Sequence, residues 1–273
     1  MKNLLFLFSA AIIISCTTAS EKTYTGSTPA AAVIRPFLGI ALTDSVDFIR
    51  WKIILRNNEY ELQANYGIGK QNTNGFINGG KKITLTGTFT KEKNRLLLQN
   101  GNTILKLVQL NDNLLHLLDD DNSLLNGTGG FSYTLNNMNP VSTDEINITF
   151  NKTALKDSIA YQGRTPCNVP GLTDLSPQCN KIKWYIVLYA NTAKDEPGRY
   201  RIFAVNWRKN GGKIGSWKMV TGKNGRIIYQ LNDDDGTGLI YLLKLDANIL
   251  VFTDAAGNLL VGDEDFSYTL NRK

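Results

Sequence analysis

The chain contains few of the residues from which metal centres and acid–base sites are usually built. Its 273 residues include one histidine (His116), three cysteines and three methionines. Imidazole, thiolate and thioether groups suit Cu(I), and histidine is the most common general acid or base. The sequence also lacks a glycine-rich phosphate loop, a nucleophile elbow and a His-Glu-x-x-His motif. We therefore predict no catalytic residue, no metal site and no cofactor, in a protein that is not an enzyme.

A long apolar run and a concentrated charge are missing too. Residues 4–14 form an apolar run that Ser9 interrupts, whereas a helix that spans a bilayer needs about 20 apolar residues. The formal net charge of +6 is spread along the chain without a run of five lysines or arginines. Because nucleic-acid binding requires a clustered basic surface, we expect no nucleic-acid partner.

The short apolar run has the proportions of a signal peptide, which we place at residues 1–15. Residues 13–16, Ile-Ile-Ser-Cys, resemble a bacterial lipobox, in which a peptidase cuts before the cysteine and that cysteine carries lipid. We predict lipidation at Cys16 and a polar tether over residues 16–23, which would anchor the protein stably to the outer membrane. The anchored protein would face the periplasm or the cell surface. The alternative is an ordinary signal peptide with a chance cysteine.

Export would leave Cys167 and Cys179 as one pair in an oxidising compartment. The loop between them contains Pro170, Gly171 and Pro177, so it can turn and bring the two sulfurs together. We predict a structural disulfide, and closing a loop of this size is worth about 3 kcal/mol. The alternative is a reactive or metal-binding thiol pair, which would lack both a Cys-x-x-Cys spacing and a nearby histidine.

The chain repeats itself once. Residues 107–136 align without a gap on residues 242–271, with 14 identities in 30 positions. The last six residues of both segments are identical, Phe-Ser-Tyr-Thr-Leu-Asn. Two further anchors recur in the same order, residues 24–29 as 161–166 and residues 49–53 as 182–186.

These anchors predict two tandem domains, because units of about 112 residues that recur at an offset of about 135 are too long for a solenoid repeat. We place the first domain at residues 24–138, the linker at 139–160 and the second domain at 161–273. The linker also has Ile146, Ile148 and Phe150 at alternate positions, which is typical of a short strand. Each domain is large enough to bury its own core, so we expect each to fold alone.

Apolar residues alternate with polar ones along most of each domain, which predicts strands with one buried face. Residues 51–53 and 60–66 predict a hairpin around Asn57-Asn58. The other strands expected in the first domain are residues 22–28, 83–89, 95–99, 103–109, 113–118 and 131–136. We find no helical pattern of twelve residues outside the signal peptide. About eight antiparallel strands per domain favour an all-β protein with two small closed barrels, and an open sandwich is the alternative.

Three motifs in order resemble those of one family. The domains open with Tyr-x-Gly-x-Thr-Pro (24–29 and 161–166) and have Gly-x-aromatic in the middle (87–89 and 215–217). They close with an Asp-containing turn (118–124 and 253–259) followed by Tyr-x-Leu. This set resembles the NlpE N-terminal domain family, whose founding members are copper-resistance and envelope-stress lipoproteins. The resemblance covers both domains and implies small lipocalin-like β-barrels on a lipid anchor.

The chain departs from that family at its cysteines. Members usually carry Cys-x-x-Cys-Pro-Gly after the opening motif. The second domain keeps Cys167, Pro170 and Gly171 but lacks the second cysteine of the motif, and the first domain has Ala30 and no cysteine there. The departure argues against a copper-handling role.

Three smaller patterns have structural or weak functional interpretations. His116 lies between two pairs of leucines, which favours a structural position in a strand. The runs 119–121 and 233–235 of three aspartates are typical of turns, since their spacing does not fit a calcium loop. Residues 44–46 and 157–159 resemble the short O-glycosylation signal of Bacteroidetes envelope proteins.

Together these observations predict a non-enzymatic outer-membrane lipoprotein that binds, senses or interacts in the cell envelope, with an envelope protein as partner. A barrel of about eight strands either fills its interior or holds one small ligand. Trp51, Tyr60, Trp184 and Trp217 are large candidates for inward positions and favour a filled interior. A carrier of a small apolar ligand is the first alternative, and a copper-handling lipoprotein is the second. The sequence singles out no ligand-binding residue.

Overall fold

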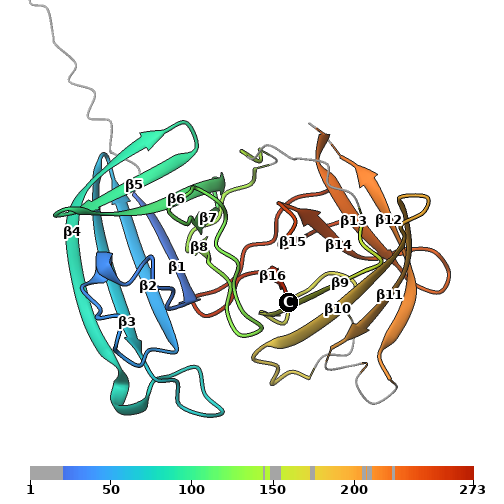
Figure 1. Ribbon diagram of the computed structural model, residues 1–273, viewed down its shortest axis with the longest axis horizontal. Coiled ribbons are helices and arrows are strands. Elements are labelled where there is room, and N and C mark those ends of the chain that lie inside the picture. The colour runs from blue at the N-terminus through green and yellow to red at the C-terminus, as the bar shows by residue number, and fades with distance from the viewer. Residues whose placement is uncertain are drawn as a thin grey trace, which may run out of the picture.

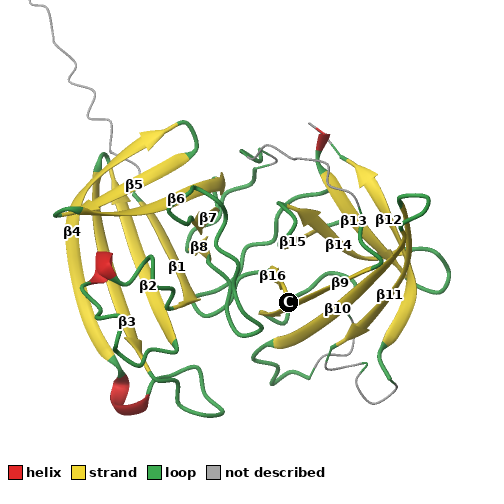
Figure 2. Ribbon diagram, viewed as in Figure 1, coloured by secondary structure: helices red, strands yellow, loops and turns green. Residues whose placement is uncertain are grey.

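Alternating apolar residues give each strand one face inside a barrel. In β3 (Glu59–Gly67), Tyr60, Leu62 and Ala64 are buried, while the residues between them are more exposed. The computed structural model describes residues 21–143, 145–147, 155–172, 176–204, 207, 211–222 and 225–273. These residues form two closed antiparallel barrels in tandem (Figures 1 and 2), which confirms the all-β prediction and its closed form over the open sandwich.

The first barrel is an up-and-down barrel in which each strand pairs with the next and β8 closes on β1. Asn57, with a φ of 54°, makes the predicted turn between β2 and β3. Two short 3₁₀ helices, η1 (Pro36–Leu38) and η2 (Ile77–Gly79), lie in the loops that follow β1 and β3. The strands are β1 (Lys22–Pro29), β2 (Phe48–Arg56), β3, β4 (Lys81–Glu92), β5 (Arg95–Asn100), β6 (Thr103–Asn111), β7 (Leu114–Leu117) and β8 (Thr134–Asn137).

The second barrel repeats this order, and β16 closes on β9. Its first strand begins at Ser158, before the predicted domain start at residue 161, because Ser158 still pairs with Tyr189. The strands are β9 (Ser158–Thr165), β10 (Ile182–Asn191), β11 (Glu196–Phe203), β12 (Lys213–Thr221), β13 (Ile227–Asn232), β14 (Gly238–Lys244), β15 (Ile249–Thr253) and β16 (Thr269–Arg272).

Large side chains fill both barrel interiors. Trp51, Tyr60, Trp184 and Trp217 are all buried, as predicted, with exposed fractions of 1%, 3%, 3% and 4%. The two barrels satisfy the indole nitrogens of β2 and β10 in the same way. Trp51 Nε1 donates to Thr28 Oγ1 and Trp184 Nε1 donates to Thr165 Oγ1, each at 2.8 Å. The threonine of the opening motif therefore serves the buried tryptophan of the next strand.

The glycine of the Gly-x-aromatic motif makes room for a buried tyrosine. A Cβ atom on Gly87 would lie 2.9 Å from the hydroxyl of Tyr60, and one on Gly215 would lie 2.6 Å from the hydroxyl of Tyr200. Both hydroxyls donate to a backbone carbonyl, Tyr60 to Gln99 at 2.7 Å and Tyr200 to Asn232 at 2.8 Å. The motif is therefore a packing device of the barrel wall.

A third apolar cluster joins the barrels to each other. Val108, Leu110 and Leu114 of the first barrel pack with Leu243, Leu245 and Ile249 of the second. Residue 108 corresponds to 243 in the repeat, 110 to 245 and 114 to 249, so both barrels contribute the same positions. In Figure 1, β7, β8, β15 and β16 accordingly lie toward the middle of the molecule. The domains thus share a core in addition to their own.

The polar part of this interface has pseudo-twofold symmetry, because equivalent residues of the repeat meet each other. Ser132 Oγ lies 2.6 Å from Ser267 Oγ, and Thr269 Oγ1 lies 3.0 Å from Thr134 Oγ1. Phe131 and Phe266 stack with ring centroids 5.8 Å apart and an angle of 5° between the rings. Contacts between the same patch on both partners define an isologous interface.

The last residue of the repeated hexapeptide extends the symmetry. Asn136 Oδ1 accepts from Gly262 N at 2.9 Å, and Asn271 Oδ1 accepts from Gly127 N at 2.7 Å. The identical hexapeptides therefore supply much of the polar and aromatic contact between the barrels. Phe131 and Ser132 serve this contact and Tyr133 packs in the core of the first barrel, so β8 begins at Thr134 and not at residue 131 as the pattern predicted.

The linker remains close to the interface where the structure describes it. Ile146 packs against the shared cluster, and Asn147 N donates to Leu110 O at 2.8 Å. Ile148 and Phe150 of the predicted linker strand lie outside the described residues, as do the predicted signal peptide and Cys16. Among the described residues, no helix is long and apolar enough to cross a membrane.

Candidate functional site

The loop between β9 and β10 contains the predicted disulfide. Cys167 and Cys179 are bonded, with their Cα atoms 6.1 Å apart, which confirms the structural pairing over the thiol alternatives. Both cysteines are partly buried against the core of the second barrel, and Val169 between them is buried. The disulfide therefore holds this loop against the end of the barrel.

The equivalent loop of the first barrel, residues 30–47, closes its barrel without a disulfide. Phe37 and Leu38 of η1 are buried in the core, with exposed fractions of 1% and 4%. The guanidinium of Arg35 donates to four carbonyls of the same loop, those of Ala30, Ala41, Leu42 and Asp44. Its Nε bonds Ala30 O at 2.9 Å, and its Nη1 bonds Leu42 O at 3.2 Å and Asp44 O at 2.8 Å. Arg35 thus joins the two ends of this loop.

His116 is structural, because it is completely buried at the interface side of β7. Its Nδ1 lies 2.9 Å from Thr134 Oγ1, and its Nε2 lies 3.0 Å from Leu125 O. Burial lowers the pKa of His116 to about 4, against the effect of the Leu125 carbonyl. The ring is therefore neutral at physiological pH. Both its nitrogens already have partners, so it is a poor candidate for a metal ligand.

Both aspartate runs make the turns that the sequence predicted. In the first, Asp121 Oδ1 accepts from Ser123 N at 2.9 Å, and hydrogen bonds from the side chain and then the backbone of Ser123 lower the pKa of Asp121. In the second, Asp235 Oδ1 accepts from Thr237 N at 2.9 Å, and Asp233 pairs with Lys213. Within the described part of the chain, no group of three or more His, Cys, Asp or Glu residues could hold a metal ion.

Two depressions lie at the end of the first barrel that residues 30–47 close. One, of about 640 Å³, lies beside η1 and is lined by Ala31, Val33, Phe37, Ile104, Asp119 and Leu125, among others. The other, of about 340 Å³, lies between the β1–β2 and β3–β4 loops, and we call it the end pocket. Its lining includes Val46, Tyr66, Ile68, Ile77 and Lys81.

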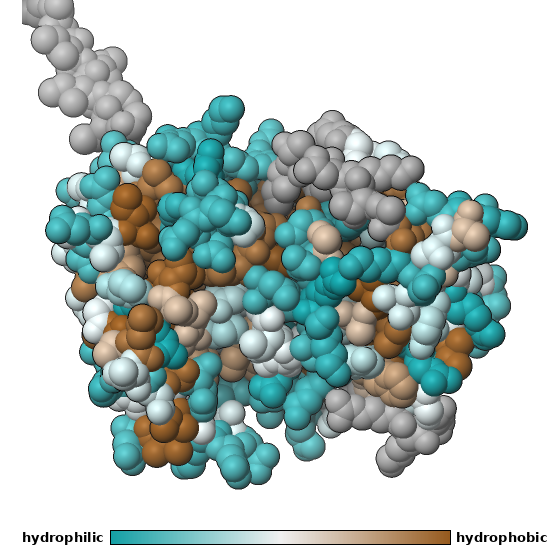
Figure 3. Space-filling view, viewed as in Figure 1, coloured by the Kyte–Doolittle hydropathy of each residue, from teal (hydrophilic) through white to brown (hydrophobic). Residues whose placement is uncertain are grey.

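Exposed apolar side chains surround the end pocket. Ile68 and Ile77 are 44% and 50% exposed, and Leu42, two residues before the lining residue Asp44, is 65% exposed. Figure 3 shows apolar residues gathered on the surface over η2, at the lower end of this barrel. Contiguous exposed apolar surface commonly marks a binding site on a soluble protein.

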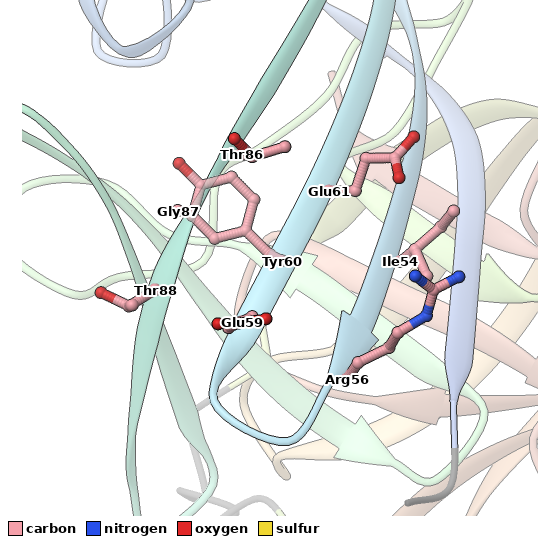
Figure 4. Close-up of a pocket in the computed structure, with 8 residues that line it drawn as sticks. All are labelled: Ile54, Arg56, Glu59, Tyr60, Glu61, Thr86, Gly87 and Thr88. Carbon is pink, nitrogen blue, oxygen red and sulfur yellow. The ribbon is translucent and has the colours of Figure 1, made fainter.

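A third depression, of about 400 Å³, lies on the β2–β3–β4 sheet (Figure 4). Two of its three charged side chains, Arg56 and Glu61, have partners in the chain. Arg56 Nε donates to Glu21 Oε2 at 2.6 Å, and Glu61 Oε1 accepts from Gln63 Nε2 at 2.7 Å. Tyr60 borders this depression, but its hydroxyl is the one that bonds Gln99 O. These partnered groups make the site a weak candidate for catalysis.

Sequence reasoning missed the end pocket and the interface between the barrels. The pocket is assembled from two loops that differ between the domains, so no repeat or motif marks it. The interface did leave a signal, since residues 114–118 (Leu-Leu-His-Leu-Leu) do not alternate. A continuous apolar run indicates a strand that is buried on both faces. The serines of the two predicted glycosylation signals, Ser45 and Ser158, are both exposed, and their modification remains a prediction.

No family model, no curated protein and no solved structure matches the chain.

Proposed function

We propose that the protein is a non-enzymatic lipoprotein, anchored to the outer membrane through Cys16, that binds a protein partner in the cell envelope. Its resemblance to the NlpE N-terminal domain family supports an envelope role. The observation that carries the binding role is the filled interior of both barrels. Because the interiors are occupied by side chains, recognition is left to the outer surface and the barrel ends.

The end pocket is the part of this surface best suited to a protein partner. It combines exposed Ile68 and Ile77 with a recess floored by Val46 and Tyr66. Interfaces are anchored by a few apolar side chains that enter such recesses, with a polar rim around them. Lys81 and Asp44, which pair at 3.7 Å, supply polar groups at this rim.

A photocrosslinker at residue 68 or 77 of the full chain tests the proposal in intact cells. We expect both positions to capture one and the same envelope protein, and a crosslinker at exposed Lys52 on β2 to miss it. The variant Ile68→Asp/Ile77→Asp should lose that partner on copurification while keeping its melting temperature, because both side chains are already exposed. Equal capture from residue 52, or undiminished copurification of the variant, would refute this site.

Anchoring is tested separately with Cys16→Ala. Loss of this cysteine should abolish incorporation of a fatty-acid probe and release the protein from the membrane fraction, since no other cysteine is free in the described chain. Cys16→Ser, which keeps the size of the side chain, should behave like Cys16→Ala. Equal labelling of the wild type and both variants would show that lipid is not attached here.

The carrier alternative has one supporting observation, the depression of about 640 Å³ beside η1. A small apolar ligand there would contact Phe37, Ile104 and Leu125 at the barrel end. Binding of a fluorescent fatty acid by the wild type, and loss of that binding in Ile104→Asp, would favour this alternative. The copper alternative is weakened because Cys167 and Cys179 are joined to each other, and we expect competition titration to detect no tight Cu(I) site in the oxidised protein.

A further inference from the structure

A basic cluster lies where the two barrels meet, on the side of the stacked Phe131 and Phe266. It consists of Arg50 from β2, Arg164 from β9 and Lys181 just before β10. Lys181 Nζ lies 5.3 Å from the ring centroid of Phe266, and the guanidinium carbon of Arg164 lies 5.9 Å from that of Phe131. Because the rings of Phe131 and Phe266 stack on each other across the interface, Arg164 and Lys181 lie on the same side of the molecule.

One carboxylate serves this cluster. Asp265 Oδ1 accepts from Arg50 Nη2 at 2.5 Å, and its Oδ2 accepts from Asn74 Nδ2 at 2.8 Å. Asn74 in turn accepts from Lys181 Nζ at 2.8 Å. The neighbouring carboxylate of Asp263 is used within its own loop, where it accepts the backbone N–H groups of Asp265 and Phe266.

The cluster therefore has an excess of two positive charges, three cations against one carboxylate. These side chains are partly buried, and the Nε atoms of Arg50 and Arg164 are buried without a hydrogen-bond partner. Burial lowers the pKa of Lys181, and the charges of Arg164 and exposed Lys183 lower it further. Partly buried charges that one carboxylate compensates only in part are costly, so the arrangement favours an anion from outside the chain.

We infer that this basic cluster binds a phosphate group, held between Arg164 of one barrel and Arg50 of the other. A phosphate monoester carries about −1.5 to −2 charges near neutral pH, which matches the excess of two. Guanidinium groups donate to phosphate oxygens in a planar fork, and Lys181 adds a point charge beside them. The inference does not depend on the envelope role proposed above.

Titration of the full chain with inorganic phosphate, followed by NMR at constant ionic strength, tests this inference. We expect saturable binding that Arg164→Gln/Lys181→Gln weakens at least about tenfold, equivalent to about 1.4 kcal/mol. The matched control, Lys52→Gln/Lys91→Gln, removes the same charge from exposed positions of the first barrel and should bind like the wild type. Without phosphate, the cluster variant should melt no lower than the wild type, because it removes repulsion between cations.

A second arm identifies the source of the phosphate. Vesicles of phosphatidylcholine with phosphatidylglycerol are compared with phosphatidylcholine alone, using the Cys16→Ala chain so that the predicted lipid anchor does not contribute. Binding to the anionic vesicles that the cluster variant loses would assign a lipid headgroup, whereas saturable binding of inorganic phosphate alone would assign a soluble ligand. Equal phosphate binding by the cluster variant and the wild type, or no saturable binding in either arm, would overturn the inference.

Discussion

The two barrels place different residues at one equivalent position of their shared interface. His116 in the first barrel corresponds to Val251 in the second, and both are fully buried. The histidine can occupy an apolar interface because Thr134 and the Leu125 carbonyl take up its two ring nitrogens. In its charged form both ring nitrogens would donate, so the Thr134 hydroxyl would have to accept instead of donate, and the charge itself would be buried, which is the main cost.

His116 should make the protein less stable in acid. Its pKa is about 4 in the folded chain, against an ordinary value of 6.5. Between these values the unfolded chain binds a proton that the folded chain does not, so the unfolding free energy falls as the pH falls. The loss reaches about 3 kcal/mol once the pH is below both values. Denaturant unfolding of the wild type from pH 7 down to about pH 4 would measure it.

His116→Val is the control, because it copies the residue of the second barrel. The variant gives up two hydrogen bonds and should be less stable at neutral pH, but its unfolding free energy should depend less on pH in this range. An identical pH dependence in the variant and the wild type would contradict the assignment of the effect to His116.

At the scale of single elements, the two barrels close the same end by different means. The second barrel uses the Cys167–Cys179 bond, and the first uses Arg35 together with the buried residues Phe37 and Leu38. A disulfide limits the conformations of the unfolded loop, whereas the arginine acts through hydrogen bonds in the folded loop. The two devices should therefore respond to different conditions.

Removal of the disulfide should lower the melting temperature by about 10 °C or more, for a loss of about 3 kcal/mol. We expect reducing agent to produce this shift in the wild type and to leave Cys167→Ser/Cys179→Ser unchanged. Differential scanning calorimetry with and without reductant measures both. If the melting temperature of the wild type does not change although the reductant is shown to cleave the bond, the loop is held by its other contacts.

Replacement of Arg35 should weaken the first barrel and be insensitive to reductant. Arg35→Met keeps the aliphatic stem and loses the charge-assisted hydrogen bonds, so we expect a loss of about 2 kcal/mol in unfolding free energy. Arg56→Met is the matched control, because Arg56 pairs with Glu21 at an exposed site, where an ion pair contributes little. Equal effects of the two variants would show that Arg35 does not hold the loop.

Strands with one exposed face were predictable, whereas the ends of strands with two buried faces were harder to predict. The alternation of residues 60–66 indicates one solvent-exposed face, so β3 was predicted from its pattern alone. β7 is buried on both faces, and its pattern predicted a strand without showing what covers the outer face. The repeated hexapeptide was evident in the sequence, but its identity in both domains does not reveal that the two copies touch. The basic cluster and the end pocket depend on how the loops and barrels are placed relative to one another. The alternation of apolar and polar residues carries no information on that placement.

On the scale of the whole molecule, the apolar cluster shared by the two barrels affects how the domains should behave once they are separated. Each barrel has its own core, which supports the expectation that each folds alone. However, a cut between residues 138 and 139 would uncover Leu110 and Leu114 on one fragment and Leu245 and Ile249 on the other. Uncovered apolar surface of this kind favours association.

We therefore expect fragments 21–138 and 139–273 to associate when they are mixed. Size-exclusion chromatography of the mixture should show a complex, and Leu245→Glu in the second fragment should abolish it by placing a charge in the apolar contact. Ile214→Glu, a partly exposed position on β12 outside the shared cluster, is the control. Fragments that stay apart at all concentrations would show that the linker is needed to hold the barrels together.

The isologous interface also determines how substitutions can accumulate in this protein. In a dimer of identical single-barrel chains, one codon change alters both sides of the interface at once, so every tolerated residue must be compatible with its own copy. Here different segments of one chain form the two sides of the interface, so the residues of one side can change while those of the other stay the same. Ser132 and Ser267 remain the same, whereas Phe48 of the first barrel corresponds to Lys181 of the second, and Ser27 to Arg164. The basic cluster, which uses one barrel's Arg164 and Lys181 without a counterpart on the other side, is an asymmetric feature that the tandem chain can carry once, whereas a symmetric dimer of identical chains could not.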